Sequence, residues 1–429
     1  MNSKLLARLV AALVLIALMS AVITGCEKKQ PANVTTIRFS CWGNDVEEVN
    51  IRTLVAEFEK RHPNIKVDLE VMPWARVFDK LMISSAGGRP PDVTRVSSEW
   101  SAPLQAKGLL EPLEPYVKRD HYDLNDFYPK TIEGWGRYKG ILYEIPTDIE
   151  VFCLYYNKDM FDKYHVPYPD ASWDWKKYVE VSKKFCKDFN GDGQLDQWGT
   201  TTDYRWQNYV YANGGRILSP DRKTCILDQK AAYEGLQFMA DLIHKYHVAP
   251  NAEEAANLGT SKLFTTGKIA TYIAGPCTPA LVFKKEIKTF KYDVAVLPKG
   301  PQVRVASVCG AAYGMLARSK HKNEAWELVK WMTGKEYQKA QALQSQIIPS
   351  RQSVAESGAY LYQKSEPKNK RAFIEMISYG QTIPRVSCGP EMDQIIQNEL
   401  DLVRLGRKSA RDACAKIKPT IDQLLRHSD

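Results

Sequence analysis

Hydrophobic and polar positions in the first quarter of the chain follow the spacing of strands and helices in turn. Residues 36–41 and 65–71 alternate apolar and polar side chains, as half-buried strands do, and residues 46–58 repeat apolar side chains at helical spacing. A helix over residues 78–83 and a third strand over residues 92–97 continue the succession. This pattern indicates an open, largely parallel α/β sheet, in which ligands bind at the carboxyl ends of the strands.

A polar crossing follows at residues 143–157, and we expect the rest of the chain to be organised around it. It contains Pro146 and two carboxylates, Asp148 and Glu150, which we expect to lie outside any buried strand because an unpaired charge is costly to bury. The apolar run over residues 151–156 is predicted to be a buried strand. Carboxylates held where two halves meet predict a ligand cleft at this crossing.

The remainder of the chain predicts long amphipathic helices with short strands between them. A chain of 429 residues exceeds what one hydrophobic core usually serves, so two domains are expected. We predict an α/β fold of two lobes joined by a hinge, each lobe assembled from separated pieces of chain. The N-terminal lobe is expected to hold residues 36–146 and about 293–333, and the C-terminal lobe residues from about 150 to 288 and from about 336 to 429. A strand over residues 292–298 is expected to carry the chain back to the first lobe.

Composition and charge narrow the class of protein. The chain has 25% charged and 44% hydrophobic residues, which is ordinary for a soluble globular protein, and its formal net charge is +9. The Lys and Arg residues form no long run, so nucleic-acid binding is not indicated. The 22 Tyr and 10 Trp residues include several in loop-like segments, where exposed rings would suit the flat faces of sugars, although filling two cores explains most of them.

The N-terminus predicts export and lipidation. Residues 1–8 are cationic, residues 9–22 are apolar, and Thr24-Gly25-Cys26 resembles a bacterial lipobox. We expect residues 1–25 to be removed, Cys26 to be lipidated, and residues 26–35 to form a tether to the cell membrane; a signal anchor or an ordinary cleaved signal is the alternative. No later run approaches the ~20 apolar residues of a spanning helix.

The other eight cysteines do not predict a metal cluster, because they show no CxxC pairing and no His at zinc spacing. An exported protein can form disulfides, and a Cys186–Cys225 bond is conceivable, but spacing leaves the connectivity open.

A separate motif suggests structural calcium. Oxygen-bearing side chains stand at alternate positions with Gly193 at the turn, as at the start of an EF-hand loop, but Gly199 occupies the position of the bidentate Glu. The motif is closer to the shortened calcium loop of some sugar-binding proteins. A turn capped by its own side chains is the alternative. The candidate ligands are Asp188, Asn190, Asp192, Gln194 and Asp196.

Several short motifs, in order and at characteristic spacing, give the chain a resemblance to family 1 extracellular solute-binding proteins, the sugar-binding components of ABC importers, similar to the maltodextrin-binding type. The resemblance implies two lobes that close on a carbohydrate and deliver it to membrane permease subunits. It also implies a monomer outside the cytoplasm, without catalysis and without a required cofactor. The motifs are Phe58-Glu-Lys60, Pro63-Asn-Ile-Lys-Val67, Pro91-Asp-Val93, Leu104-Gln-Ala-Lys-Gly-Leu-Leu-Glu-Pro112, Tyr156-Asn-Lys-Asp159, Leu263-Phe-Thr-Thr-Gly-Lys268, Asn323-Glu-Ala-Trp326 and Ile348-Pro-Ser-Arg351.

The resemblance also implies ligand-binding positions. Asp45 falls where the maltodextrin-binding type has a ligand-contacting aspartate, and Glu99 matches its second aspartate. Trp100 replaces an arginine, Glu150 coincides with the hinge glutamate, and Tyr204 with a ring-stacking tyrosine. Carboxylates accept pairs of sugar hydroxyls and aromatic rings cover the C–H faces of pyranoses, so the set fits a carbohydrate.

Two aromatic positions of that type are missing, since Cys277 and Pro390 stand in their places, and this puts maltodextrin itself in doubt. Trp42 and Trp206 are the candidates to replace them. Structural roles stay open for several positions, such as a helix cap at Asp45, a hinge brace at Asp148 and core packing at Tyr313. The further candidates for ligand contact are Asn44, Asp148, Gly275, Gly310 and Tyr313.

Two other functions compete with solute capture. A lipid-anchored glycoside hydrolase could use Asp148 and Glu150 as paired carboxylates, but residues i and i+2 of an extended segment point to opposite faces. A sugar sensor or adhesion protein is the third possibility, and nothing in the chain decides against it.

Overall fold

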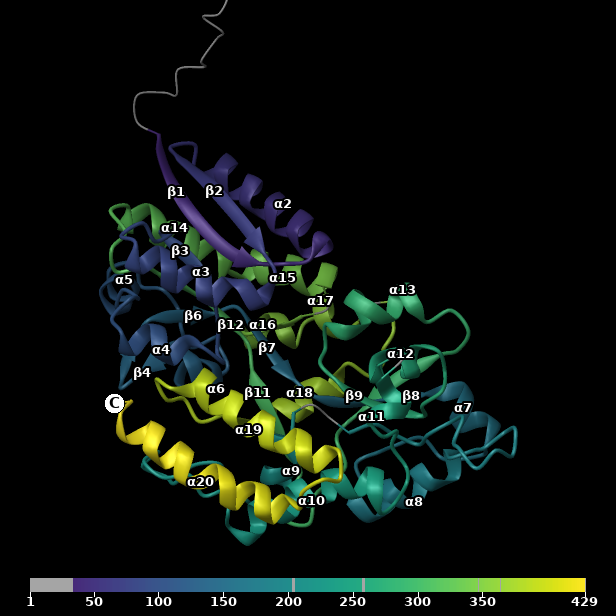
Figure 1. Ribbon diagram of the computed structural model, residues 1–429. Coiled ribbons are helices and arrows are strands. Elements are labelled where there is room, and N and C mark those ends of the chain that lie inside the picture. The colour runs from purple at the N-terminus through teal and green to yellow at the C-terminus, as the bar shows by residue number, and fades with distance from the viewer. Residues whose placement is uncertain (1–33, 203–204, 257–258, 346, 363, 429) are drawn as a thin grey trace, which may run out of the picture.

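The protein folds into two lobes, and its structure is a computed structural model that describes residues 34–202, 205–256, 259–345, 347–362 and 364–428. In Figure 1 the upper lobe carries β1 (Thr35–Trp42) and β2 (Ile65–Met72), and the lower lobe ends with α19 (Gly389–Arg404) and α20 (Ala410–Arg426). The predicted two-lobed α/β architecture is confirmed.

The first lobe is built on a five-stranded sheet in the order β2-β1-β3-β12-β6. As predicted, the strands β1, β2 and β3 (Val93–Ser97) are parallel, whereas β12 (Ala311–Met315) runs antiparallel to β3 and to β6 (Glu144–Pro146). The apolar side chains that alternate along β1, such as Phe39, pack with Phe58 and Trp326 from two covering helices. The principal helices of this lobe are α2 (Asp45–Arg61), α3 (Trp74–Ala86), α14 (Lys322–Met332) and α15 (Lys335–Ser345).

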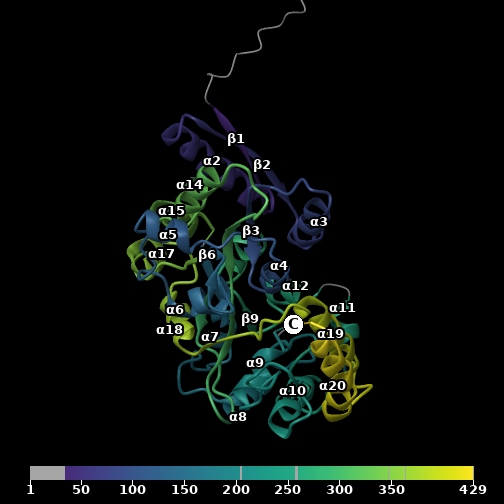
Figure 2. The same cartoon turned by 90° about the vertical axis from the view of Figure 1, so that its left-hand side faces the viewer.

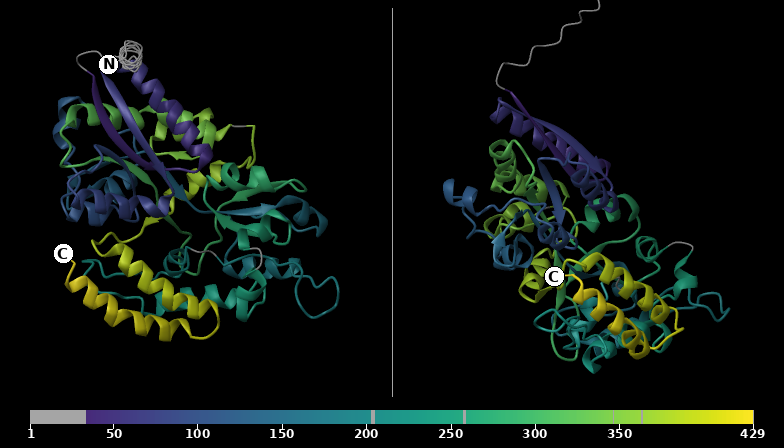
Figure 3. Two further views of the ribbon diagram at one scale, coloured as in Figure 1. Left: turned by 45° about the horizontal axis from the view of Figure 1, so that its top comes forward. Right: turned by 60° about the vertical axis from the view of Figure 1, so that its left-hand side comes forward.

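The second lobe is built on an antiparallel sheet in the order β10-β8-β9, formed by β8 (Cys153–Asn157), β9 (Thr271–Ala274) and β10 (Tyr292–Ala295). Its longer helices include α8 (Trp175–Phe185) and α10 (Lys230–His244), which are joined by the stacked rings of Trp175 and Phe238 at 3.9 Å. Figures 2 and 3 show α19 and α20 packed side by side at the outer end of this lobe, far from β1 and β2.

A third sheet, in the order β13-β7-β11-β14, connects the lobes. Its strands are β7 (Asp148–Val151), β11 (Ala306–Cys309), β13 (Ile348–Pro349) and β14 (Gly380–Thr382). Single residues separate β6 from β7, β7 from β8 and β11 from β12, so the chain passes from lobe to lobe on nearly continuous strands. Such strands can bend at a few residues, as a hinge requires.

Three details of the predicted organisation were wrong. The segment around Asp148 is a strand and not a connector, because Arg95 pairs with the buried carboxylate and removes the cost that argued against burial. The chain returns to the first lobe on β11 and β12 and not on β10, which belongs to the second sheet. In addition, α15 packs on the first lobe, where Tyr337 contacts Tyr313, so the second segment of the C-terminal lobe does not begin at about residue 336.

The remaining elements are short. Residues 137–142 form a hairpin whose turn residues, Lys139 and Gly140, both have positive φ.

Among the described residues no helix is both long and apolar enough to cross a membrane. All eight cysteines after residue 26 are free thiols, including Cys186 and Cys225. The short elements are β4 (Arg137–Tyr138), β5 (Ile141–Leu142), α4 (Ser101–Ala106), α5 (Glu114–Arg119), α6 (Pro129–Thr131), η1 (Ile132–Gly136), α7 (Lys158–Lys163), α9 (Gln207–Ala212), α11 (Ala252–Ala256), α12 (Thr260–Thr265), η2 (Pro279–Phe283), α13 (Lys284–Glu286), α16 (Gln352–Ala355), α17 (Gly358–Leu361) and α18 (Arg371–Ser378).

Candidate functional site

A cavity of about 340 Å³ lies between the two lobes, and both lobes contribute its walls. Four tryptophans line it: Trp74, Trp100, Trp135 and Trp206. Its volume falls in the range of small-molecule sites, and its walls combine aromatic rings with a small number of charged groups. We call it the tryptophan cavity. Its principal polar lining residues are Ser98, Glu99, Arg205, Gln207, Arg385, Asp393 and Gln397.

The first lobe places its wall residues at the carboxyl end of β3. The turn after Ser97 is fixed on the strand crossing, because Ser98 and Gly310 exchange two hydrogen bonds of 2.9 and 3.1 Å. Trp100 follows this turn, is 4% exposed, and packs against Phe78 with ring centroids 5.6 Å apart. This end of the parallel strands is where the α/β pattern predicted a ligand.

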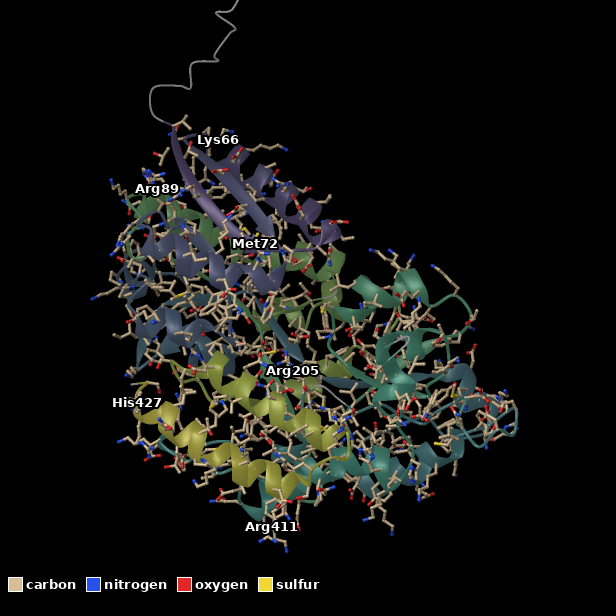
Figure 4. The ribbon with its side chains drawn as sticks, in the orientation of Figure 1. Lys66, Met72, Arg89, Arg205, Arg411 and His427 are labelled. Carbon is tan, nitrogen blue, oxygen red and sulfur yellow. The ribbon has the colours of Figure 1, made fainter. Side chains whose placement is uncertain are left out.

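An ion pair joins the lobes across the tryptophan cavity. Arg205 of the second lobe approaches Glu99 of the first at 2.5 Å, and both side chains are largely shielded from water. Figure 4 shows Arg205 near the centre of the molecule beside α19. The neighbouring Trp206, which begins the approach to α9, is 1% exposed. Two adjacent residues of one segment therefore supply a cation, Arg205, and an aromatic ring, Trp206, to the cavity wall.

The second lobe adds a further wall from the segment before α19 and from its first turns. Asp393 on α19 lies at the rim of the cavity, and its side chain is open to solvent. The pKa of its carboxyl is raised, first because the surrounding protein displaces water from it and second because of the negative charge of Glu99. A carboxylate at this position can accept hydrogen bonds from a ligand hydroxyl.

Glu150 lies in the hinge sheet, beside the tryptophan cavity but not among its lining residues. Burial raises the pKa of its carboxyl, which Arg205 partly counteracts, and the Cys309 thiol donates to it at 3.6 Å. Gly275 touches the same carboxylate so closely that a Cβ would lie 2.6 Å from its Oε1. Glu150 and Gly275 thus form one packed unit at the hinge.

Asp148 and Tyr313 were predicted to contact the ligand, and the structure gives both a different role. The carboxylate of Asp148 pairs with Arg95 at 2.8 Å and accepts the N–H of Ala311 at 2.7 Å, so it braces the strand crossing. Tyr313 is buried in the first-lobe core, and its hydroxyl hydrogen-bonds the hydroxyl of Tyr337 at 2.9 Å. Neither side chain lines the tryptophan cavity.

The residues predicted as contacts at the end of β1 do not line the tryptophan cavity either. Asn44 is the N-cap of α2 and forms a capping box with Glu47, which leaves Asn44 and Asp45 exposed outside the cavity. Trp42 packs edge-on against Trp100 and lies under the Arg95 guanidinium at 4.2 Å. It supports the cavity wall from behind instead of lining it.

Gly310 likewise shapes the site without lining it, since a Cβ there would lie 2.4 Å from the Asp148 carbonyl oxygen. Tyr204 and Cys26 lie outside the described residues. Of the predicted contact residues, the structure therefore brings three to the tryptophan cavity: Glu99, Trp100 and Trp206.

Sequence reasoning missed two tryptophans and the segment before α19. Trp135 stands between two glycines, Gly134 and Gly136, in a short irregular helix, and this unusual context was the available signal. Trp74 is 44% exposed at the first position of α3, where an exposed large ring could have been noticed. Arg385 precedes α19 in a segment without periodicity, so no sequence pattern points to it.

The predicted calcium loop is closed by its own hydrogen bonds. Asp188 accepts the N–H groups of Gly191 and Gly193 at 2.7 and 2.9 Å, and Asp196 accepts the N–H of Phe189 at 2.8 Å. In the described part of the chain no group of three or more His, Cys, Asp or Glu side chains is arranged to hold a metal. Calcium binding by this loop stays a prediction.

Comparisons with known proteins show the family and the fold of the chain. The family model of bacterial extracellular solute-binding proteins matches residues 44–339. A galactooligosaccharide-binding protein of Bacillus subtilis is 26% identical over 386 residues, covering 87% of this chain and 86% of that protein. A maltooligosaccharide ABC transporter solute-binding lipoprotein of Streptococcus pneumoniae is 24% identical, covering 86% of this chain and 85% of its own.

Solved structures show the same fold. An ABC substrate-binding protein from Listeria monocytogenes in complex with cycloalternan matches with a TM-score of 0.82 at 24% identity, covering 91% of this chain and 99% of that one. A receptor of Streptomyces glaucescens, solved unliganded and with acarbose, matches with a TM-score of 0.77 at 22% identity, covering 92% and 100%. The resemblance predicted from the sequence is confirmed, and this chain belongs to the family of bacterial extracellular solute-binding proteins.

Proposed function

We propose that this protein captures an oligosaccharide in the tryptophan cavity and delivers it to the membrane permease of an ABC importer. The observation that carries the proposal is the convergence of four tryptophans, two carboxylates and two arginines from both lobes on one cavity. Indole rings cover the apolar C–H faces of pyranoses, and carboxylates and guanidinium groups bond their hydroxyls. The oligosaccharide-binding relatives support the same ligand class.

Lobe closure supplies the transport signal in this proposal. A ligand that touches Glu99 and Trp100 on one lobe and Trp206 on the other stabilises the closed form, because it makes all of these contacts only when the lobes approach. The closed form then presents both lobes to the permease. The hinge sheet, with its nearly continuous strands, provides the axis for this movement.

The location we propose is the outer face of a cell membrane, with a lipid on Cys26 and the leader removed. The support is the sequence of the leader together with the related lipoproteins of Streptococcus pneumoniae and Streptomyces antibioticus. Metabolic labelling with a fatty acid, which a Cys26→Ser variant should abolish, tests this part separately.

A glycoside hydrolase is less well supported. The proposed catalytic pair, Asp148 and Glu150, does not line the tryptophan cavity, and Asp148 is held in an ion pair with Arg95. Of the acids that do line it, Glu99 is paired with Arg205. Recovery of unaltered sugar after prolonged incubation with the protein is the expected result.

Calorimetric titration with galacto- and malto-oligosaccharides tests sugar binding. A Trp74→Ala variant should weaken binding by about 5- to 10-fold, because one stacked ring contributes about 1 kcal/mol or slightly more. Trp331→Ala is the matched control, since Trp331 is partly buried on α14 and lies outside the tryptophan cavity. Equal losses in the two variants, or no heat with any sugar, would contradict the proposal.

A further inference from the structure

A second, larger cavity adjoins the tryptophan cavity. It has a volume of about 680 Å³, and the two share Gly134, Arg385 and Val386 in their walls. Six arginine or lysine side chains line it, but only two carboxylates, Glu133 and Asp221. We call it the basic groove. Its cationic residues are Arg137, Lys139, Arg222, Lys223, Arg385 and Arg426.

Both lobes contribute cations to the basic groove. Arg137 and Lys139 belong to the β4–β5 hairpin of the first lobe, whereas Arg222, Lys223 and Arg426 belong to the second. Figure 1 shows β4 next to the C-terminal end of α20, where the groove lies. A ligand in the groove can therefore contact both lobes, as a ligand in the tryptophan cavity does.

The neighbouring carboxylates neutralise only one of these cations, Arg137, which pairs with Glu114 and Glu133. Glu133 is already paired with Arg137 at 3.3 Å, and Asp221 accepts the hydroxyl of Ser219 and a backbone N–H. Within the described ranges, Lys139, Arg222, Lys223 and Arg426 form no ion pair with a carboxylate. The groove consequently keeps a surplus of positive charge that faces open space.

Arg385 lies at the junction of the two cavities and is the cation of the groove nearest the tryptophan cavity, since it lines both. Its guanidinium donates to the carbonyl groups of Gly134 and Arg137 at 3.0 and 2.7 Å, to the Ser101 hydroxyl at 2.8 Å and to the Gln105 amide oxygen. All of these acceptors are neutral. Its Nε is buried without a hydrogen-bond partner among the described residues. Because no carboxylate is among these partners, the charge of Arg385 lacks a counterion within contact distance in the described part of the chain.

The carboxyl of Glu144 does not compensate for the positive charge of Arg385. Burial raises the pKa of Glu144 to about 8, so this carboxyl is largely protonated at neutral pH. Burial also lowers the pKa of Arg385 to about 10, against the attraction of Glu144, and Arg222 acts in the same direction as burial. An anion bound at the junction would relieve this unfavourable arrangement, and arginine pairs readily with planar carboxylates and with sulfate oxygens.

We propose that the ligand is an acidic oligosaccharide, with its sugar rings in the tryptophan cavity and a carboxylate or sulfate group in the basic groove beside Arg385. This inference rests on the proposed function and specifies its substrate class. Arg137 is paired with Glu133 and Glu114, but a neutral sugar would leave the other five cations of the groove without a carboxylate partner among the described residues.

Calorimetric titration of the full chain in mild detergent tests the inference with galactotriose and maltotriose in three forms. The first form is neutral, the second has a primary alcohol oxidised to a uronate carboxylate, and the third carries one sulfate ester. The expected result is at least tenfold tighter binding of one acidic form than of its neutral parent, with a loss of that advantage as sodium chloride is raised from 50 to 500 mM. The tighter of the two acidic forms identifies the anion.

Variants on the exposed rim of the groove keep the fold intact. Arg222→Gln with Lys223→Gln should weaken binding of the acidic form at least fivefold and binding of the neutral parent less than twofold. Lys66→Gln with Arg411→Gln removes the same charge at exposed sites outside the groove lining and should change neither; Figure 4 shows both residues away from His427, whose neighbours Arg426 and Ser428 line the groove.

Each remaining outcome overturns a stated part of the account. Neutral sugars that bind as tightly as their acidic forms, or a groove variant that binds the acidic form like the control, overturn the acidic ligand and leave the proposed function standing. Failure of all six sugars to bind overturns both.

Discussion

Replacing Asp148 with asparagine tests its structural role in the hinge. Its carboxylate lies 2.8 Å from the Arg95 guanidinium, and both side chains are almost completely buried. The variant keeps the shape of the side chain but removes the charge, so Arg95 would remain buried without a counterion.

The expected loss follows from that burial. Removing one partner of a buried ion pair costs about 3 to 5 kcal/mol, because the remaining charge stays desolvated. Unfolding entropy of about 2.1 cal/mol/K per residue gives about 0.9 kcal/mol/K for 429 residues. The melting midpoint should therefore fall by about 3 to 6 °C in a single unfolding transition.

Glu150→Gln is the matched control, because Glu150 stands two residues along the same strand and forms no ion pair with any described residue. Burial already raises the pKa of its carboxyl, so removing that charge should cost much less. Calorimetric melting of the two variants and the unaltered protein provides the comparison. A fall of less than 1 °C for Asp148→Asn, or equal falls for both variants, would refute the role of Asp148 as a brace.

Three further predictions follow from the hinge and the site. The pKa of Glu144 is raised from 4.5 to about 8, so the folded state binds a proton that the unfolded state has lost, and folding stability should decrease as pH rises through this range. The decrease should reach up to about 1.4 kcal/mol per pH unit. Denaturant titrations at several pH values measure this slope, which Glu144→Gln should flatten. Gly310→Ala should lower the melting midpoint by several degrees because its Cβ would lie 2.4 Å from a backbone oxygen, whereas Gly87→Ala, with 3.4 Å to its nearest atom, should not. Glu99→Gln removes the ion pair with Arg205 and should shift the sugar-free protein towards an open form, which has a larger radius of gyration in X-ray scattering. An unchanged radius would show that this ion pair does not hold the lobes together.

The elements that sequence predicted best are those with strong periodicity. The first three strands and the first two helices were placed within a few residues, because one apolar face decides their burial. The strand at Asp148 was missed since its burial depends on Arg95, which lies far away in sequence. Local pattern cannot show a partner that only the fold brings near.

The candidate site shows the same limit. Glu99 and Trp100 were found through the family resemblance, which matches them to ligand-contacting positions, and Trp206 was found as a candidate to replace a missing ring. The roles of Asn44 and Tyr313, a helix cap and a core hydroxyl pair, depend on geometry that residue type alone does not fix. The cations of the basic groove come from scattered segments, so their surplus becomes visible only when the lobes are assembled.

Hydrogen–deuterium exchange with and without sugar tests the central claim, that an oligosaccharide binds between the lobes. Galactotriose and maltotriose, in neutral and acidic forms, are the ligands to use. The account predicts that a binding sugar slows exchange together in residues 98–102 of the first lobe and in residues 205–207 and 384–393 of the second. Protection confined to one lobe, or exchange that no sugar alters, would contradict it.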